Sequence, residues 1–577
     1  MTARGKLLIV VCLWPLLLSA GCTGCHDSTT SSRPASLDSP AASGQYHGEL
    51  LSYAIDNLNR LEEFDSADVV EQIFRRLNPQ GQTESAPSDP LLATWPEPEM
   101  LRQIVDRLNQ WIGGQQPPAG WKPDPMLSSL PQSLADLPQL KELGRLEFSR
   151  FDGYVLQEAL WFRDVGRWAG GDAADNLQRA KRLFDWTIRN IQLEAPNANP
   201  IPQFPWETLL FGRGTANERA WVFILLARQL GLDAAMLAVE EGPRASAEPP
   251  AKNAGAGKGA KGQAVPRSAA LTFRPWCVAV LIEGNAYLFD LVLGLPIPAP
   301  DGVKFDDAGQ LTIRPATLAQ VVADEKLLRQ LDADKTHVYG VKASDLKHVA
   351  VMLEASPSYL ARRMKLLESH LAGAQKMVLT TSPSVEATHW KAVAHVAEVR
   401  LWSWPFETLQ RRAHLDRKAV QAQLAAQLPL YGMPSAPLRR GRILHLKGKF
   451  VGDEGAMHYY QLARPSNAEL SASSAHPLEK MVYLRGKQDA TYWSGLISCQ
   501  RDNYTAAVDY FGRRMLELFP HSPWTNGARY NLARTFEAAG DTERAILVYE
   551  SDADAPGYLG ELLRAKWLTK RPKKAGP

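Results

Sequence analysis

Apolar residues recur at intervals of three and four residues along most of the chain, which is the spacing of one face of an α-helix. In residues 176–191, for example, Ala180, Leu183 and Phe184 fall on one side. Residues 220–230 show the same pattern and end at Gly231, a residue that commonly stops a helix. The pattern predicts further helices over residues 46–77 with a break near residue 65, over 97–112, over 318–430 with an exception at 401–404, and over 496–518 and 528–549.

Three short apolar runs interrupt the helical pattern in the middle of the chain. Residues 234–239, 276–282 and 286–291 have the length and composition of strands, and Glu283-Gly284-Asn285 between the last two is typical of a turn. These runs predict a small sheet whose last two strands form a hairpin. The predicted fold class is therefore α+β, mainly helical around a central mixed core.

The domain organisation follows from length and from changes in composition. A body of more than 500 residues exceeds what one hydrophobic core normally supports, so we expect several domains. Residues 242–268 are poor in apolar residues and rich in Gly, Ala, Lys and Pro, which predicts a flexible insertion. We predict an N-terminal helical region over 46–155, an α+β core over 156–300 that contains this insertion, a helical region over 301–485, and helical hairpins over 486–570.

The N-terminus has the order of a secretory signal peptide. Arg4 and Lys6 precede an apolar run over residues 7–18, and small residues at 19–21 lead to Cys22. The run is shorter than the roughly 20 apolar residues that cross a bilayer. We therefore predict a cleaved signal peptide over residues 1–21.

The segment Leu18-Ser19-Ala20-Gly21-Cys22 resembles a lipobox, in which the cysteine is acylated and becomes the first residue of the mature chain. The resemblance implies lipidation of Cys22 and attachment to a membrane. Because Thr23 rather than an acidic residue follows, it also implies a cell-envelope location on the periplasmic face of the outer membrane. An ordinary secretory signal that happens to hold a cysteine is the alternative. Residues 22–45, rich in Ser, Thr, Ala and Pro, are predicted to be a disordered tether.

Composition excludes several classes of partner and cofactor. The net charge of +3 is too small to indicate nucleic-acid binding. Once Cys12 leaves with the signal peptide and Cys22 carries lipid, Cys25, Cys277 and Cys499 remain, at spacings that match no metal motif or disulfide framework. No phosphate-binding glycine loop is present. We predict no metal and no cofactor.

The order of elements between residues 176 and 298 resembles the transglutaminase-like superfamily, a branch of the papain-like cysteine enzymes. The residues that carry the resemblance are Gly214 before an apolar helix, Trp276 on a strand, and Asp290 after Tyr287-Leu288-Phe289. In that family a cysteine two residues after the glycine is the nucleophile, a histidine two residues before the tryptophan is the base, and the aspartate orients the histidine.

Two of these three positions carry the wrong chemistry in this chain. The nucleophile position is Ala216, which has no lone pair, and the base position is Arg274, which cannot accept a proton at neutral pH. Only Asp290 has the residue type that the family has at its position. No histidine occurs in residues 48–336, and Cys277 is the only cysteine there, so a shifted alignment restores no Cys-His pair. Loss of one such group can lower turnover on the order of 10⁶-fold, so we predict a degenerate triad without acyl-transfer activity.

Two further predictions concern the surroundings of Asp290 and Cys277. A buried Asp290 needs a partner, and we predict that the Arg274 guanidinium supplies it in place of the histidine. Cys277 lies in an apolar strand, which favours a small buried core residue over a displaced nucleophile.

The last helices show an internal repetition. Ala507 with Phe511 and Ala545 with Tyr549 are pairs four residues apart, and the two pairs are offset by 38 residues. With a turn at Gly540, they resemble tetratricopeptide repeats, whose usual period is about 34 residues. An unrelated helical bundle is the alternative.

Together these observations predict a membrane-anchored envelope lipoprotein with a non-catalytic transglutaminase-like domain, a pseudoenzyme that acts in protein or peptide binding or as a scaffold. One alternative is a hydrolase or acyl-transfer enzyme that uses unrecognised residues. Another is a structural envelope protein without a specific ligand.

Overall fold

The computed structural model describes residues 40–63, 98–196, 201–240, 273–307, 309–415, 427–431, 436–466, 468 and 477–571. Contacts divide the chain into two units, Met1–Tyr46 and His47–Pro577. The predicted signal peptide, Cys22, residues 64–77 and the insertion over 242–268 lie outside the described residues. Helix α1 (Pro40–Asn59) already includes residues 40–45 of the predicted disordered tether.

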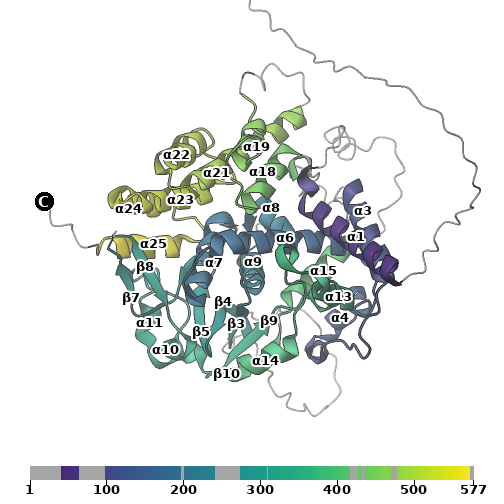
Figure 1. Cartoon of the computed structure of the whole chain (residues 1–577). Coiled ribbons are helices and arrows are strands. Elements are labelled where there is room, and N and C mark those ends of the chain that lie inside the picture. The colour runs from purple at the N-terminus through teal and green to yellow at the C-terminus, as the bar shows by residue number, and fades with distance from the viewer. Residues whose placement is uncertain are drawn as a thin grey trace, which may run out of the picture. The chain divides into compact units, whose positions relative to one another are not determined.

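A mixed sheet with the strand order β10-β9-β3-β4-β5-β6 forms the centre of the second unit (Figure 1). β9 and β10 run parallel to each other, and the remaining neighbours pair antiparallel. The strands are β3 (Asp233–Glu240), β4 (Phe273–Ile282), β5 (Asn285–Asp290), β6 (Leu295–Pro296), β9 (Val349–Leu353) and β10 (Val396–Leu401). The hairpin of β7 (Pro298–Phe305) and β8 (Leu311–Pro315) and the short parallel pair of β1 (Gln192–Leu193) and β2 (Arg213–Gly214) are separate sheets.

The predicted strands at 234–239, 276–282 and 286–291 are β3, β4 and β5, and the predicted turn between the last two is confirmed. The prediction of a helical region over 301–485 is wrong at residues 301–305 of β7 and at β8, β9 and β10. β9 pairs on both sides and is buried along its whole length. A strand covered on both faces is a continuous apolar run without alternation, and periodicity alone does not distinguish such a run from a buried helix.

Helices from residues 150–229 cover one face of the sheet. They are α6 (Arg150–Gly170), α7 (Asn176–Asn190), α8 (Pro205–Phe211) and α9 (Ala216–Gln229). α9 begins where Thr215 and Glu218 form a capping box, in which each side chain accepts a hydrogen bond from the other residue's backbone N–H. It stops before Gly231, whose φ of 70° suits glycine.

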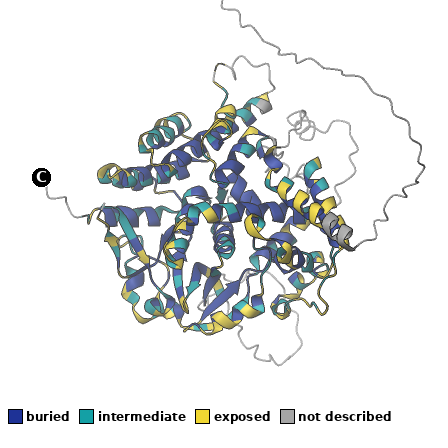
Figure 2. Cartoon of the chain, viewed as in Figure 1, coloured by how far each residue is buried: buried dark blue, intermediate teal, exposed yellow. Residues whose placement is uncertain are grey.

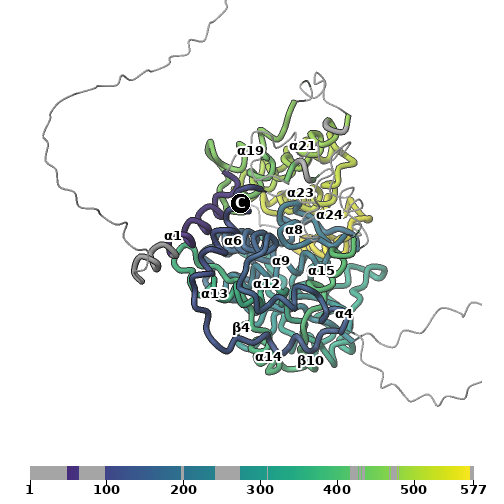
Figure 3. Tube along the Cα trace, turned by 90° about the vertical axis from the view of Figure 1, so that its right-hand side faces the viewer, coloured from purple at the N-terminus to yellow at the C-terminus, as the bar shows by residue number. Residues whose placement is uncertain are grey.

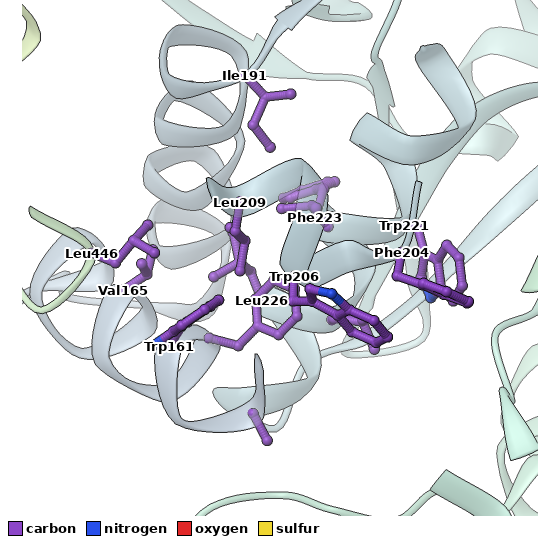
Figure 4. Close-up of a cluster of buried hydrophobic side chains, with 14 of the residues drawn as sticks. Trp161, Val165, Ile191, Phe204, Trp206, Leu209, Trp221, Phe223, Leu226 and Leu446 are labelled. Carbon is purple, nitrogen blue, oxygen red and sulfur yellow. The ribbon is translucent and has the colours of Figure 1, made fainter. Parts of the chain in front are cut away.

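The main hydrophobic core lies where these helices meet. Figure 4 shows Trp161 of α6, Leu209 of α8 and Phe223 of α9 turned toward one another, and all three are almost fully buried. In Figure 2 the buried residues gather at this junction, and Figure 3 shows α9 inside the surrounding helices. This packing fixes α9, the helix expected to carry the family's nucleophile.

A second core lies on the opposite face of the sheet. Leu237 and Val239 of β3 point into it, whereas Met236 and Ala238 belong to the main core, as the alternation of a strand requires. Trp567 of the C-terminal helix packs there too. The covering elements are α10 (Leu318–Ala323), α11 (Glu325–Arg329), η4 (Ala343–Leu346), α14 (Pro383–Lys391) and α25 (Tyr558–Leu568).

Shorter helices flank these layers. On the N-terminal side they are η1 (Leu61–Glu63), α3 (Glu99–Gly113), η3 (Pro125–Ser129), α4 (Gln132–Ala135) and α5 (Pro138–Lys141). The middle of the chain adds α12 (Pro357–Leu360), α13 (Arg362–His370), η5 (Gly373–Gln375), α15 (Trp404–His414), α17 (Leu428–Tyr431), α18 (Pro437–Leu446) and α19 (Ala456–Leu462).

The C-terminal part of the second unit is helical, as predicted. Its elements are α21 (Pro477–Gln500), α22 (Tyr504–Val508), the π-helical η6 (Asp509–Glu517), α23 (Thr525–Ala538) and α24 (Thr542–Tyr549), followed by α25. Ala507, Phe511, Ala545 and Tyr549 are all fully buried between these helices. Their assignment to tetratricopeptide repeats stays a prediction.

The α+β fold class is confirmed, with helices around a mixed sheet and a helical C-terminal region. Among the helices that the structure describes, none combines the length and the apolar character needed to span a membrane.

Candidate functional site

Ala216 occupies the position predicted for the family's nucleophile, at the first residue of α9. In the family a thiolate would sit at this helix N-terminus. Here Glu218 is the acidic group of the first turn, and its carboxylate accepts hydrogen bonds from the backbone N–H of Thr215 at 2.7 Å and of Gln203 at 2.6 Å. Burial raises the pKa of Glu218. The Glu218 carboxylate therefore binds the backbone N–H of the N-cap residue Thr215 and links α9 to Gln203.

Asp290 ends β5 and is 4% exposed. Its Oδ2 accepts a hydrogen bond from the Tyr339 hydroxyl at 2.6 Å, and its Oδ1 accepts from the backbone N–H groups of Val292 and Leu293, each at 2.9 Å. Tyr339 in turn accepts from Trp276 Nε1 at 2.7 Å. Burial raises the pKa of Asp290. The carboxylate is thus fully engaged in a structural network.

The direction in which Asp290 points argues against a catalytic role. Its neighbour Phe289 packs on Phe184 and Phe223, with ring centroids 5.1 and 5.5 Å apart, and so faces the helices α7 and α9. Successive side chains of a strand point to opposite faces. Asp290 therefore faces the second core, the side of Trp276 and Tyr339.

The prediction that Arg274 partners Asp290 is wrong. Arg274 is exposed near the start of β4 and forms neither a hydrogen bond nor an ion pair with Asp290, whose partner is Tyr339. The register pairs Val278 with Phe289, so Arg274 lies three residues beyond the position opposite Asp290, roughly 10 Å along the strand. Exposing the charged Arg274 side chain to solvent costs less free energy than burying it.

The cysteine nearest to this region is buried, as the sequence predicts. Cys277 is 1% exposed in the second core. Burial raises the pKa of its thiol well above the ordinary value, with a further contribution from Asp290. A neutral thiol of this kind is a poor nucleophile.

Arg219 holds the first turn of α9 against its neighbours, and sequence reasoning did not find it. Its buried guanidinium donates to the carbonyl oxygens of Ile188 and Ile191 at the end of α7, and to that of Leu291 after β5. Burial lowers the pKa of Arg219 to about 10, so it stays charged near neutral pH. An arginine within an apolar helical stripe gives no sequence signal of this role.

The C-terminal helices pack on the segment that leads into α9. Gly212, with a φ of 61°, lies against the ring of Trp493 on α21, where a β-carbon would collide with it. The guanidinium of Arg213 lies 5.5 Å from the ring centroid of Trp524. Gln192 of β1 donates to the carbonyl of Pro523 at 2.7 Å and accepts from the N–H of Gly527 at 2.8 Å.

Little space is left at this junction. A cavity of about 40 Å³ lies between Arg219 of α9, the residues after β5, and Tyr530 and Glu561 of the C-terminal helices. Such a volume holds one or two water molecules. Ala216 does not line this cavity and is itself partly exposed.

No group of three or more His, Cys, Asp or Glu side chains that could hold a metal ion occurs in the described part of the chain. Within the same part, Cys277 and Cys499 are both free and buried.

Comparison with protein families identifies one region. Residues 166–255 match the Transglutaminase-like superfamily, so the chain contains a transglutaminase-like domain, as its sequence pattern predicts. The match includes α9 with Ala216 and ends before β4, so it does not reach Arg274 or Asp290. No curated protein and no solved structure matches the chain.

Proposed function

We propose that the protein is a membrane-anchored envelope lipoprotein whose transglutaminase-like domain is non-catalytic and acts in protein or peptide binding or as a scaffold. The observation that carries the proposal is the state of the three triad positions. Ala216 offers no nucleophile, Arg274 is exposed and cannot act as a base, and Asp290 is committed to Tyr339.

The loss of activity is tested on the purified full chain. Incorporation of a fluorescent primary amine into a glutamine-containing peptide measures acyl transfer, and release of the amine from an amide measures hydrolysis. We expect no turnover above a heat-unfolded control. Turnover that disappears on substitution of one residue would establish the enzyme alternative and overturn the proposal.

A thiol-directed activity probe needs one control. Cys25 lies in the predicted tether and would react without being catalytic, so the Cys25→Ser variant is compared with the parent chain. We expect no labelling of the folded, lipidated Cys25→Ser variant, because Cys12 is removed with the signal peptide, the Cys22 thiol is acylated, and Cys277 and Cys499 are buried.

Anchoring is tested with a matched pair of variants. Cells are fed an alkyne-bearing fatty acid, and the protein is examined for label and for its distribution between membrane and soluble fractions. We expect label and membrane association in the parent chain and in Cys25→Ser, and loss of both in Cys22→Ser. Labelling that persists in Cys22→Ser contradicts the anchor.

The scaffold role predicts a partner that crosslinks reproducibly in cells. Crosslinked complexes purified from the parent strain are compared with those from a strain expressing Cys22→Ser. If neither strain returns a reproducible partner, the chain is a structural envelope protein bound only by its lipid, and the binding role is wrong.

A further inference from the structure

A second cavity, much larger than the one beside α9, also lies against α7. It measures about 560 Å³, within the range of roughly 300–1,000 Å³ that is typical of small-molecule sites. One face of α7 forms its floor, and β6, β8, α21, α23 and α25 contribute walls. Figure 1 shows α7 between the sheet and the C-terminal helices. We call this cavity the α7 groove. None of the three triad positions lines it.

The groove is basic. Lys181, Arg182, Arg189, Arg534 and Arg564 line it, against the single carboxylate of Asp185. Three of these cations are paired with carboxylates, since Arg534 pairs with Asp185 at 2.8 Å, Arg564 with Glu537 at 2.7 Å and Arg182 with Asp172 at 3.1 Å.

Two of the basic groups have no carboxylate in contact. Lys181 is half-buried and forms no hydrogen bond or ion pair. Arg189 donates only to Cys499 Sγ at 2.7 Å and to Asn531 Oδ1 at 3.3 Å. Burial lowers the pKa of Lys181 and so disfavours its charged form, whereas, although burial opposes them, Cys499 and Asp185 raise the pKa of Arg189. An anionic ligand in the groove would stabilise the charged form of Lys181.

Two residues that line the groove, one turn apart on α7, each have a buried polar atom without a partner. The atoms are the donor Trp186 Nε1 and the acceptor Asn190 Oδ1. Trp186 is 5% exposed and Asn190 is 1% exposed, so neither side chain turns to solvent. The Asn190 amide nitrogen is already used, because it donates to the carbonyl of Trp186. Most buried polar groups in folded proteins have a partner. A ligand with a hydrogen-bond acceptor beside a hydrogen-bond donor would satisfy both atoms.

Aromatic rings complete the site. Trp168 meets Phe450 edge to face at 5.3 Å and Trp186 at 6.5 Å between ring centroids. The Trp168 Nε1 donates to the carbonyl of Leu446, so its polar atom is satisfied and its ring serves as an apolar surface. A ring or an apolar chain of the ligand can pack there.

We propose that the α7 groove binds a small anionic ligand that carries a carboxylate beside an N–H or O–H donor, together with an apolar or ring-shaped part. The carboxylate lies near Lys181 and Arg189 and accepts from Trp186 Nε1, and the donor reaches Asn190 Oδ1. The carboxyl end of a peptide and an acidic sugar both have this chemistry. The site does not depend on whether the transglutaminase-like domain is catalytic.

Binding is measured by isothermal titration calorimetry on the purified full chain in detergent. The peptide arm compares N-acetyltryptophan with N-acetyltryptophanamide, which differ in the carboxylate alone. The sugar arm compares glucuronate with glucose, and inorganic phosphate tests bare charge. We expect one charged member to bind and its neutral counterpart to bind at least about tenfold more weakly, because a hydrogen bond to a charged group contributes more than a neutral one. The arm that binds identifies the source of the ligand.

Matched variants locate the site. Trp186→Phe removes an unpartnered N–H, keeps an aromatic ring, and is expected to weaken binding about tenfold. Trp206→Phe removes another buried, unpartnered indole N–H outside the groove and is expected to leave binding unchanged. Lys181→Gln should also weaken binding, whereas Lys391→Gln at an exposed position should not. Circular dichroism confirms that each variant is folded.

Three results would overturn the proposal. One is no binding of either charged probe. Another is binding of phosphate as tightly as of the carboxylates, because charge alone would then suffice. The third is unchanged affinity in a folded Trp186→Phe variant.

Discussion

Glu561 of α25 is buried at the junction between the C-terminal helices and the transglutaminase-like domain. It is 5% exposed, lines the small cavity beside Arg219, and its Oε2 has no hydrogen-bond partner. Burial, with a smaller contribution from Asp552, raises its pKa from 4.5 to about 8. We predict that Glu561→Gln, which resembles the protonated acid, stabilises the folded protein.

The pH dependence of this effect follows from the raised pKa. Below pH 4.5 the glutamate is protonated in both the folded and the unfolded chain, so Glu561 causes no penalty. As the pH rises toward 8, the unfolded chain ionises freely while the folded one does not, and stability is lost by about 1.4 kcal/mol per pH unit. Glu561→Gln should therefore gain about 3 kcal/mol at pH 7 and about 5 kcal/mol above pH 8.

The assay is urea unfolding followed by tryptophan fluorescence at pH 5, 7 and 9. Glu543→Gln, at an exposed position on the adjacent helix α24, is the control and should follow the parent chain at every pH. A difference between Glu561→Gln and the parent chain that does not grow with pH would refute the reasoning, as would destabilisation at pH 9.

Two further predictions concern packing and buried charge. Gly212→Ala and Gly231→Ala impose similar backbone strain, but only the β-carbon at residue 212 collides with Trp493. Gly212→Ala should therefore lower the free energy of unfolding by about 1–3 kcal/mol more than Gly231→Ala in the same assay. Equal losses would contradict the packing of α21 on this segment. Arg412 donates to both carboxylate oxygens of buried Glu207, at 2.9 and 3.0 Å, so Arg412→Met should cost about 3–5 kcal/mol. Replacing Glu207 with Met as well should recover part of that loss, and no recovery would show that the buried charge is not the cause.

Local patterns were sufficient to predict much of the fold. The helical stripe of α9, its stop at Gly231, and the hairpin of β4 and β5 follow from residues close together in sequence. β9 did not follow, because its burial on both faces depends on pairing with β3, more than 100 residues earlier.

The residue types at the candidate site could be predicted from the sequence, but the contacts that these residues make could not. Ala216 and Arg274 are read directly from the sequence. The partner of Asp290 is Tyr339, 49 residues later, in a loop without any local signal. The family's base position suggested Arg274, but this residue is exposed on β4, where its guanidinium is hydrated.

The α7 groove depends on the tertiary fold in the same way. The sequence predicts α7 as a helix. It does not distinguish the basic face of α7 from an ordinary solvated surface, because the C-terminal helices that enclose this face are distant in sequence. The unpartnered state of Trp186 and Asn190 is a property of that packing and has no sequence signature.

The central claim is that neither the residue types nor the geometry of the three triad positions permits acyl transfer. The most direct test restores the missing groups in the double variant Ala216→Cys/Arg274→His and measures amine incorporation by the purified chain. The account predicts no turnover, because Asp290 is held by Tyr339 on the far face of the sheet and cannot orient the introduced histidine. Turnover that appears in the double variant and disappears again with Asp290→Asn would contradict it.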